Sequence, residues 1–285
     1  MNYQHAFHAG NFADVHKHVV LTRIVDYLRA KPAAFRVIDT HAGAGRYDLA
    51  GPEAARAGEW RNGIARVFPL RRSGAGAADN AQALLAPYLD IVASLNRDDE
   101  LRLYPGSPLI AKSLLRSQDR LTACELEPRA ATSLKAALRG DPRAKVLAID
   151  GWVALNANVP PKERRGLVLI DPPYEESDDF HRLSAAFAKA HRKWPTGLYL
   201  LWYPIKTREA AEALARRLRR LGLAKVMRCE LSVGEPRPDS GLVGSGLILA
   251  NPPYPLEREL QILLPALTRL FGQGGSYRID WLAGE

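Results

Sequence analysis

The fold is decided by nine consecutive residues, Leu167-Val168-Leu169-Ile170-Asp171-Pro172-Pro173-Tyr174-Glu175. The four apolar residues at its start are too few for a helix and fit a short strand that is buried on both faces. The strand must end at Pro172, since proline cannot donate a hydrogen bond to a neighbouring strand. Asp171 is therefore expected at the carboxyl end of a central strand, where open α/β sheets bind their ligands.

Asp171, Pro172 and Tyr174 form a pattern that can hold a flat base carrying an exocyclic amine. The carboxylate of Asp171 and the carbonyl oxygen of Pro172 can accept the two amine protons, and the ring of Tyr174 can stack on the base. The same residues could instead be a strand-ending turn with a solvated acid and a packed tyrosine, because short motifs also occur by chance.

The composition describes a globular protein with an excess of basic residues. The chain has 285 residues, of which 47% are hydrophobic and 25% charged, so a large core is expected and global disorder is excluded. The net charge of +9 indicates an anionic partner, with nucleic acid ahead of an anionic membrane surface. Cys124 and Cys229 do not have metal-ligand spacing, and we find neither a secretion signal nor a membrane-spanning apolar run. These features predict reduced thiols and a cytoplasmic protein without membrane association.

The N-terminal segment predicts a helix over residues 12–30. Asn11 can cap it, apolar residues follow at helical spacing, and Pro32 ends the segment. Five of the seven histidines lie in the first 41 residues, but a metal cluster is disfavoured, because His16 and His18 point away from each other on a helix and no cysteine supports them. Contacts to an anionic ligand or RNA suit these side chains better, although a solvated face is also compatible with the sequence.

A glycine turn follows the first predicted strand, residues 36–40. Gly43 and Gly45 let the backbone approach a ligand closely, and Asp39 before the turn fits a loop that binds a nucleoside cofactor. A phosphate-binding P-loop is excluded because no Gly-Lys-Ser/Thr follows. A dinucleotide fingerprint is incomplete, because Asp48 stands in place of its third glycine.

Residues 47–103 interrupt the alternation of strands and helices and predict a small helical insertion subdomain. The insertion explains the position of Glu125, which follows the glycine turn by 80 residues but follows Ser107 by only 18. In nucleoside-binding folds the ribose-binding acid follows the glycine turn by roughly 20 residues. When the insertion is left out of the count, Glu125 lies at about this distance from the turn. Glu125 is therefore the predicted ribose ligand, and Glu127, expected on the same face of the strand, is the competing choice.

Two later segments also carry polar groups after predicted strands. Asp150 and Gly151 follow the strand 145–149 and suit the edge of an adenine ring. The tetrapeptide Asn251-Pro252-Pro253-Tyr254 resembles the motif at Asp171, and its amide could also hold an amine. We do not expect it to be catalytic, because it follows the last predicted strands, at the sheet edge and away from the point where the other ligands converge.

These motifs occur in the order found in S-adenosylmethionine-dependent adenine-N6 methyltransferases. They are Asp39-Thr40-His41-Ala42-Gly43-Ala44-Gly45, Tyr104-Pro105-Gly106-Ser107-Pro108, Glu125, Asp150-Gly151 and Asp171-Pro172-Pro173-Tyr174. With Tyr3, the stretch Phe7-His8-Ala9-Gly10-Asn11 and Lys17-His18, the chain resembles the bacterial large-subunit ribosomal RNA adenine-N6 methyltransferases of the RlmJ family. The resemblance extends over nearly the whole chain, and the combined motifs are far more specific than any one of them.

The resemblance implies a Rossmann-like class I methyltransferase sheet of seven strands with a helical insertion. The methyltransferase domain would comprise residues 1–46 and 104–285, and the insertion residues 47–103. The implied S-adenosylmethionine contacts, together with the glycine turn, are His18, His41, Gly43, Ser107, Glu125, Asp150, Gly151 and Asp171. Tyr3 matches a position associated with the RNA substrate, and no metal is required. The partner would be 23S ribosomal RNA, either free or in an early assembly particle, and the protein is expected to be a monomer.

The predicted reaction is transfer of a methyl group to N6 of an adenine in 23S ribosomal RNA. Asp171 and Pro172 would draw the amine towards tetrahedral geometry, Tyr174 would stack on the base, and Asp171 would accept a proton late in the reaction. The alternatives are a DNA adenine-N6 methyltransferase, a protein glutamine methyltransferase and a non-catalytic RNA-binding protein of ribosome assembly. The intact tetrapeptide beginning at Asp171 argues against the non-catalytic alternative.

Overall fold

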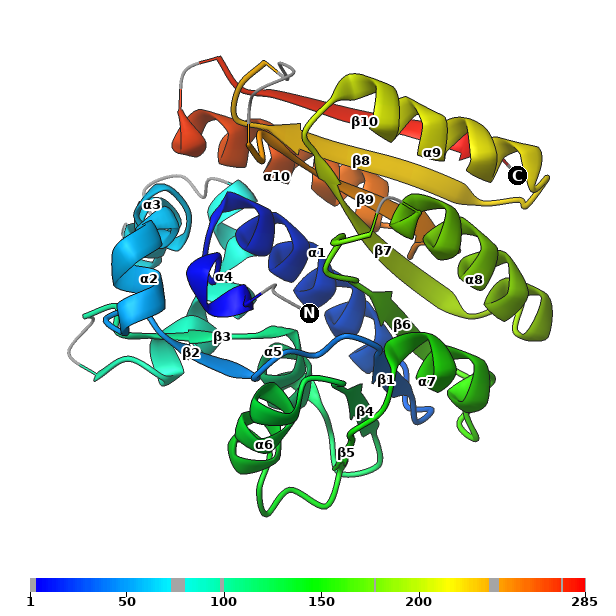
Figure 1. Cartoon of the computed structure of the whole chain (residues 1–285), viewed down its shortest axis with the longest axis horizontal. Helices are drawn as coiled ribbons and strands as arrows, with labels where there is room; N and C mark the ends of the chain where they lie inside the picture. Colours follow the sequence, from blue (N-terminus) through cyan, green and yellow to red (C-terminus); the bar gives the residue numbers. More distant parts are fainter. Residues whose placement is uncertain are drawn as a thin grey trace.

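The computed structural model shows an α/β fold in which helices cover both faces of one large sheet (Figure 1). It describes residues 4–72, 80–97, 100–176, 178–235, 241–272 and 274–284. Within these ranges the large sheet has eight strands. Their spatial order is β10 (Ser276–Ala283), β8 (Val226–Ser232), β9 (Gly244–Ala250), β7 (Leu198–Ile205), β6 (Gly166–Ile170), β1 (Arg36–Asp39), β4 (Arg120–Cys124) and β5 (Ala144–Leu147).

The strand directions confirm the predicted α/β sheet, but the described sheet has one strand more than the seven predicted. Five neighbouring strands, from β7 through β6, β1 and β4 to β5, are parallel. Strand β9 is antiparallel to both β7 and β8, and β10 is antiparallel to β8. The strand that the sequence analysis missed is β10, because most of its side chains are exposed or half-buried at the sheet edge and form no apolar run.

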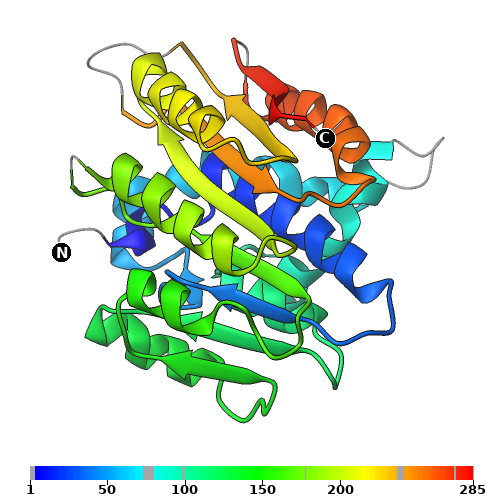
Figure 2. The same ribbon diagram turned by 90° about the vertical axis from the view of Figure 1, so that its right-hand side faces the viewer.

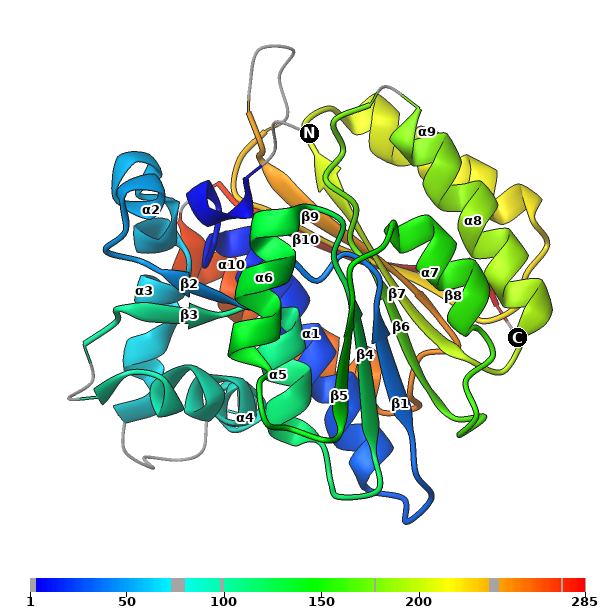
Figure 3. The same ribbon diagram turned by 60° about the horizontal axis from the view of Figure 1, so that its bottom comes forward.

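Strand β6 occupies the central place that the sequence predicts. It lies between β1 and β7, and all five of its residues are buried. Because β6, β1, β4 and β5 are parallel, their carboxyl ends meet at the same edge of the sheet (Figure 3). Asp171 is the first residue after β6 and therefore lies at this edge.

Helices cover the two faces of the sheet and bury a separate apolar cluster on each. The larger cluster includes apolar residues of α1 (Phe12–Arg29), α5 (Ser107–Leu114), α6 (Pro128–Ala137) and α10 (Leu256–Phe271). The other includes residues of α7 (Gly151–Asn158), α8 (Asp179–Lys193) and α9 (Arg208–Arg220), drawn in green to yellow in Figure 2. The side chain of Asn11 caps α1 by accepting a hydrogen bond from the backbone N–H of Asp14. No helix in the described part of the chain is long and apolar enough to cross a membrane.

The segment between β1 and α5 adds helices to the side of the sheet that α1 covers (Figure 1). It begins and ends with a two-stranded antiparallel sheet of β2 (Arg46–Asp48) and β3 (Leu103–Pro105). Its helical elements are α2 (Pro52–Ala57), η2 (Glu59–Asn62), α3 (Ile64–Val67), η3 (Phe68–Arg72) and α4 (Asn80–Ser94). The N-terminal turn η1 (His5–Phe7) precedes this segment in the chain and packs against α2. The buried face of α4 packs on α1 and α10 and belongs to the same apolar cluster. The added helices are therefore fixed against the sheet domain.

Candidate active site

Four acidic residues meet at the carboxyl edge of the parallel strands. Asp39 ends β1, Glu125 follows β4 directly, Asp150 precedes α7 after β5, and Asp171 follows β6. These strands are neighbours in the sheet, so residues that are far apart in sequence come together. Carboxylates at this edge can accept hydrogen bonds from hydroxyl and amine groups of a nucleoside ligand.

Glu125 is joined to the glycine turn that follows β1. Its Oε2 accepts a hydrogen bond of 2.8 Å from the backbone N–H of Gly43, which has a φ of +62°. A Cβ atom at Gly43 would lie 2.2 Å from the hydroxyl oxygen of Tyr47, so only glycine fits. The predicted extension of this strand to Glu127 is wrong, because β4 ends at Cys124 and Glu127 caps α6 through the backbone N–H groups of the next turn. The strand-face argument for Glu127 therefore fails, and Glu125 is the acid beside the turn.

The neighbouring loop places Asp150 and Gly151 against the first turn of α7. Asp150 Oδ1 caps this helix by accepting hydrogen bonds from the backbone N–H groups of Trp152 and Val153, at 2.8 and 2.9 Å. A Cβ atom at Gly151 would lie 2.2 Å from the carbonyl oxygen of Thr40, which explains the glycine. Burial lowers the pKa of His41, whose ring lies beside Gly151, to about 4, so this ring is neutral at pH 7.

Among the buried polar atoms of the described residues that have no hydrogen-bond partner, two belong to residues at this edge of the sheet. They are Nε2 of His18 and Oδ1 of Asp39. His18 Nδ1 is 2.8 Å from the hydroxyl of Tyr104, and Asp39 Oδ2 accepts a hydrogen bond of 2.7 Å from Ser107. Burial lowers the pKa of His18 to about 3 and raises the pKa of Asp39 to about 7. An unsatisfied buried polar group is costly, so these atoms fit a ligand with polar groups of its own, such as the amino-acid part of S-adenosylmethionine.

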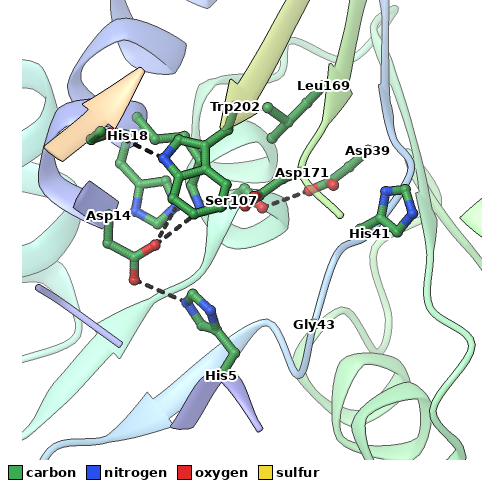
Figure 4. Close-up of polar contacts among 12 residues, drawn as sticks. His5, Asp14, His18, Asp39, His41, Gly43, Ser107, Leu169, Asp171 and Trp202 are labelled. Atoms are coloured by element: carbon green, nitrogen blue, oxygen red, sulfur yellow. Dashed lines mark hydrogen bonds and ion pairs between the residues drawn. The ribbon is translucent and has the colours of Figure 1, made fainter. Parts of the chain in front are cut away.

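Lys17 of α1 connects Asp171 to the buried Asp14 of the same helix. Figure 4 shows Asp14, His5 and Asp171 around this point. Its Nζ donates to Asp14 Oδ1 at 2.9 Å and to Asp171 Oδ2 at 2.5 Å, and His5 Nε2 lies 3.0 Å from Asp14 Oδ2. Burial alone would lower the pKa of Lys17, but Asp14 and Asp171 raise it above its usual value. Burial likewise opposes ionisation of Asp14, yet His5, Lys17 and His18 hold its pKa well below the usual value. Lys17 therefore remains protonated and fixes the carboxylate of Asp171.

Trp202 of β7 lies beside Asp171. Ile170 pairs with Leu201, so the next residues, Asp171 and Trp202, are neighbours where β6 ends. The half-buried indole lies 5.8 Å from Lys17 Nζ, measured to the ring centroid. Its Nε1 donates a hydrogen bond of 3.0 Å to Ser245, which fixes the plane of the ring.

The proline turn after Asp171 holds Tyr174 against Trp202. Tyr174 has a φ of +54°, and its hydroxyl donates a hydrogen bond of 2.6 Å to the carbonyl oxygen of Trp202. The rings of Tyr174 and Trp202 are 5.6 Å apart with an angle of 70° between their planes, and Phe180 packs on Tyr174 at 5.0 Å. Burial raises the pKa of Tyr174 well above its usual value, so the hydroxyl remains a donor. The two rings thus form a corner beside Asp171.

Lys17, Asp14 and Trp202 were not predicted as site residues, and His5 was predicted only as one of the N-terminal histidines suited to an anionic ligand or RNA. A lysine with an acid three residues earlier, within the apolar run of α1, was a signal that these charges are buried together. Trp202 gave no such signal, because a tryptophan in an apolar strand is typical of a core residue. Tyr3, predicted to contact RNA, lies outside the described residues.

The second tetrapeptide, which begins at Asn251, lies away from Asp171, as predicted. The prediction that it follows a strand at the sheet edge is wrong. It follows β9, which is an internal strand between β7 and β8 and not a sheet edge. Because β9 is antiparallel to β7, its carboxyl end lies at the edge opposite Asp171. The amide of Asn251 donates to the carbonyl oxygens of Pro195 and Gly197, and Tyr254 is 96% exposed. Asn251 therefore serves to join two loops.

The strand order, the glycine turn and the acids at the carboxyl edge define a class I S-adenosylmethionine-dependent methyltransferase. The family described as "Ribosomal RNA large subunit methyltransferase D, RlmJ" matches residues 32–283. Proteins named "Ribosomal RNA large subunit methyltransferase J" from Escherichia coli and Haemophilus influenzae are each 40% identical to the chain, over the full length of both sequences. The crystal structure of protein LPL1258 from Legionella pneumophila is 36% identical, with a TM-score of 0.88 over 96% of this chain and 98% of that one. The chain belongs to this family.

Proposed function

We propose that this methyltransferase modifies N6 of an adenine in 23S ribosomal RNA. The observation that carries the proposal is the position of Asp171, whose carboxylate lies at the carboxyl end of β6 between Lys17 and Trp202. An acid, a proline carbonyl and aromatic rings at this point can hold a planar base by its exocyclic amine. The curated relatives named after large-subunit ribosomal RNA support this RNA as the substrate.

The two carboxylate oxygens of Asp171 can have different roles, one bound to Lys17 and the other open to the adenine amine. Lys17 engages Oδ2 of Asp171, and no hydrogen bond to Oδ1 is formed among the residues that the structure describes. In the proposal, Oδ1 and the carbonyl oxygen of Pro172 accept the two protons of the adenine N6. This arrangement directs the nitrogen lone pair away from the ring plane, where it can act as a nucleophile. Protonated Lys17 cannot accept a proton, so the proton released from N6 goes to Asp171.

The corner formed by Tyr174 and Trp202 would receive the adenine after it leaves its stack in the RNA. Stacking on an aromatic side chain contributes about 1–3 kcal/mol per base and offsets part of the cost of unstacking. The hydroxyl of Tyr174 is already bound to the backbone of Trp202. The rings therefore need little reordering, which preserves the alignment of N6 with the methyl donor.

The cofactor contacts in this proposal follow the polar atoms at the strand ends. Glu125 would bind the ribose hydroxyls, Asp150 and Gly151 the adenine edge, and His18 and Asp39 the amino-acid part. Bound S-adenosylmethionine supplies an electrophilic methyl group on a sulfonium. Ser107 and Tyr104 keep Asp39 and His18 in place for this contact.

Methyl-group labelling tests the proposal. The protein is incubated with labelled S-adenosylmethionine and, separately, with 23S ribosomal RNA, 16S ribosomal RNA, double-stranded DNA and large ribosomal subunits. The labelled product is then digested to nucleosides and identified by mass spectrometry. Label in N6-methyladenosine of 23S RNA supports the proposal, whereas label in DNA or in another nucleoside rejects it.

A further inference from the structure

The two helices beside the proposed active site enclose a groove that the proposed reaction does not use. Helices α7 and α8 lie side by side on the face opposite α1 (Figures 1 and 3). Between them is a cavity of about 500 Å³, lined by both helices. We call this cavity the α7/α8 groove. Its floor consists of Leu155, Ala186 and Ala190, and alanine side chains on α8 leave room for a flat group.

The rim of the α7/α8 groove is aromatic and mainly cationic. The guanidinium of Arg182 lies 5.0 Å from the centroid of the Trp152 ring, and both residues line the groove. Lys189 lies about two helical turns further along α8, roughly 10 Å by the rise of an α-helix. Lys189 is exposed and forms no ion pair within the described ranges, and Asp178 is the acid that lines the groove. This chemistry suits a nucleotide, because arginine planes and aromatic rings stack on bases and lysines bind phosphates.

The groove is continuous with the site around the cofactor residues. Trp152 follows Asp150 and Gly151, and its ring lies edge-on to His41 at 5.1 Å. Arg182 Nη2 lies 3.5 Å from Asp150 Oδ2. Because Asp150 lies at the carboxyl edge of the sheet, the end of the groove that Arg182 lines is also at this edge. Helix α8 also follows the loop that carries Asp171. The loop that begins at Asp171 thus leads in sequence to the helix that lines the groove.

We propose that the α7/α8 groove binds single-stranded RNA next to the target adenine, with a base on Arg182 and the alanine floor and a phosphate at Lys189. The proposal rests on the function proposed above, and it names the part of the chain that holds the flanking nucleotides. Such contacts hold the strand while the target base is unstacked, and they act on RNA binding more than on the methyl transfer itself.

Two substitutions test the groove without changing the residues around Asp171 or the cofactor. Lys189→Ala removes the phosphate contact, and Ala185→Glu adds a negative charge at an exposed groove position. The matched controls are Lys135→Ala and Ala136→Glu, which change exposed residues of α6 outside the groove. Binding is measured by fluorescence anisotropy with a labelled single-stranded RNA of about 15 nucleotides that has one central adenine. Each titration is repeated at several salt concentrations, and S-adenosylmethionine affinity is measured by calorimetry.

For Lys189→Ala we expect the dissociation constant for RNA to rise about fivefold, and the slope of its logarithm against log salt to fall by about 0.7. Ala185→Glu should weaken RNA binding at least as much, while both controls bind like the original protein. In methylation assays the groove variants should raise KM for RNA and leave kcat within about twofold. Affinity for S-adenosylmethionine should not change.

Two results would overturn the groove assignment. One is RNA binding by Lys189→Ala and Ala185→Glu that matches the two controls in affinity and salt slope. The other is a loss of S-adenosylmethionine affinity in the groove variants, which would make the groove part of the cofactor site. The outcome is separate from that of the proposed function, which fails if the unmodified protein does not form N6-methyladenosine in 23S RNA.

Discussion

Replacing Lys17 by methionine removes the cation that joins Asp14 to Asp171. Lys17 Nζ is 2.9 Å from Asp14 and 2.5 Å from Asp171, and the side chains of Lys17 and Asp14 are only 5% and 2% exposed. Removing one partner of a buried ion pair costs about 3–5 kcal/mol. Asp171 is 14% exposed and His5 still pairs with Asp14, so we expect the lower end of this range, about 3 kcal/mol. Methyl transfer should fall at least about 100-fold, because Asp171 is no longer held in position.

Urea unfolding with linear extrapolation gives the change in the free energy of unfolding. Lys135→Met is the control for loss of a lysine, since Lys135 is exposed, and should remain within about 0.5 kcal/mol of the original protein. Adding Asp171→Asn to Lys17→Met removes one of the two carboxylates, so a double-mutant cycle should show a coupling of at least about 1 kcal/mol. Original stability and original turnover in Lys17→Met would refute the assigned role of Lys17.

Three further predictions concern the cofactor and the base. Glu125→Ala should weaken S-adenosylmethionine binding at least about tenfold by calorimetry, because a charge-assisted hydrogen bond is lost. If Glu125→Ala kept its affinity and Glu127→Ala lost affinity instead, the ribose contact would belong to Glu127. Trp202→Ala should raise KM for RNA about tenfold, because stacking on the base is lost, and should leave cofactor affinity unchanged. The control Trp281→Ala, at the sheet edge, should change neither quantity. Equal effects of the two substitutions would contradict a contact between Trp202 and the base. Burial raises the pKa of Asp39 to about 7, so the stability that its protonated form contributes is complete below pH 4 and is lost as pH rises through 7. Asp39→Asn should therefore stabilise the cofactor-free protein by about 2–4 kcal/mol at pH 8 and change it little at pH 4, and the same change at both pH values would be inconsistent with this titration.

Local sequence patterns predicted the strand ends that carry the acids. The apolar run before Asp171 and the two prolines after it are enough to place that residue at the end of a buried strand. Glu125 could be found because the insertion could be recognised and removed from the spacing. In both cases the signal lies within a few residues of the site or in a spacing along the chain.

Other site features depend on packing between distant segments. The ion pair of Lys17 and Asp171 joins residues 154 positions apart, and it requires α1 to lie across the end of β6. The place of Trp202 depends on the register of β6 and β7, which a single strand pattern does not specify. Strand β10 was missed because a half-exposed edge strand lacks a continuous apolar run.

The central claim is that the carboxylate of Asp171 holds and deprotonates an adenine amine in 23S RNA. Its most direct test is the rate of N6-methyladenosine formation by Asp171→Ala, measured by mass spectrometry of nucleosides, with S-adenosylmethionine affinity and unfolding followed in parallel. We expect a folded variant that still binds the cofactor and forms N6-methyladenosine at least about 1000-fold more slowly than the original protein. Formation of N6-methyladenosine at the original rate by Asp171→Ala would contradict the claim.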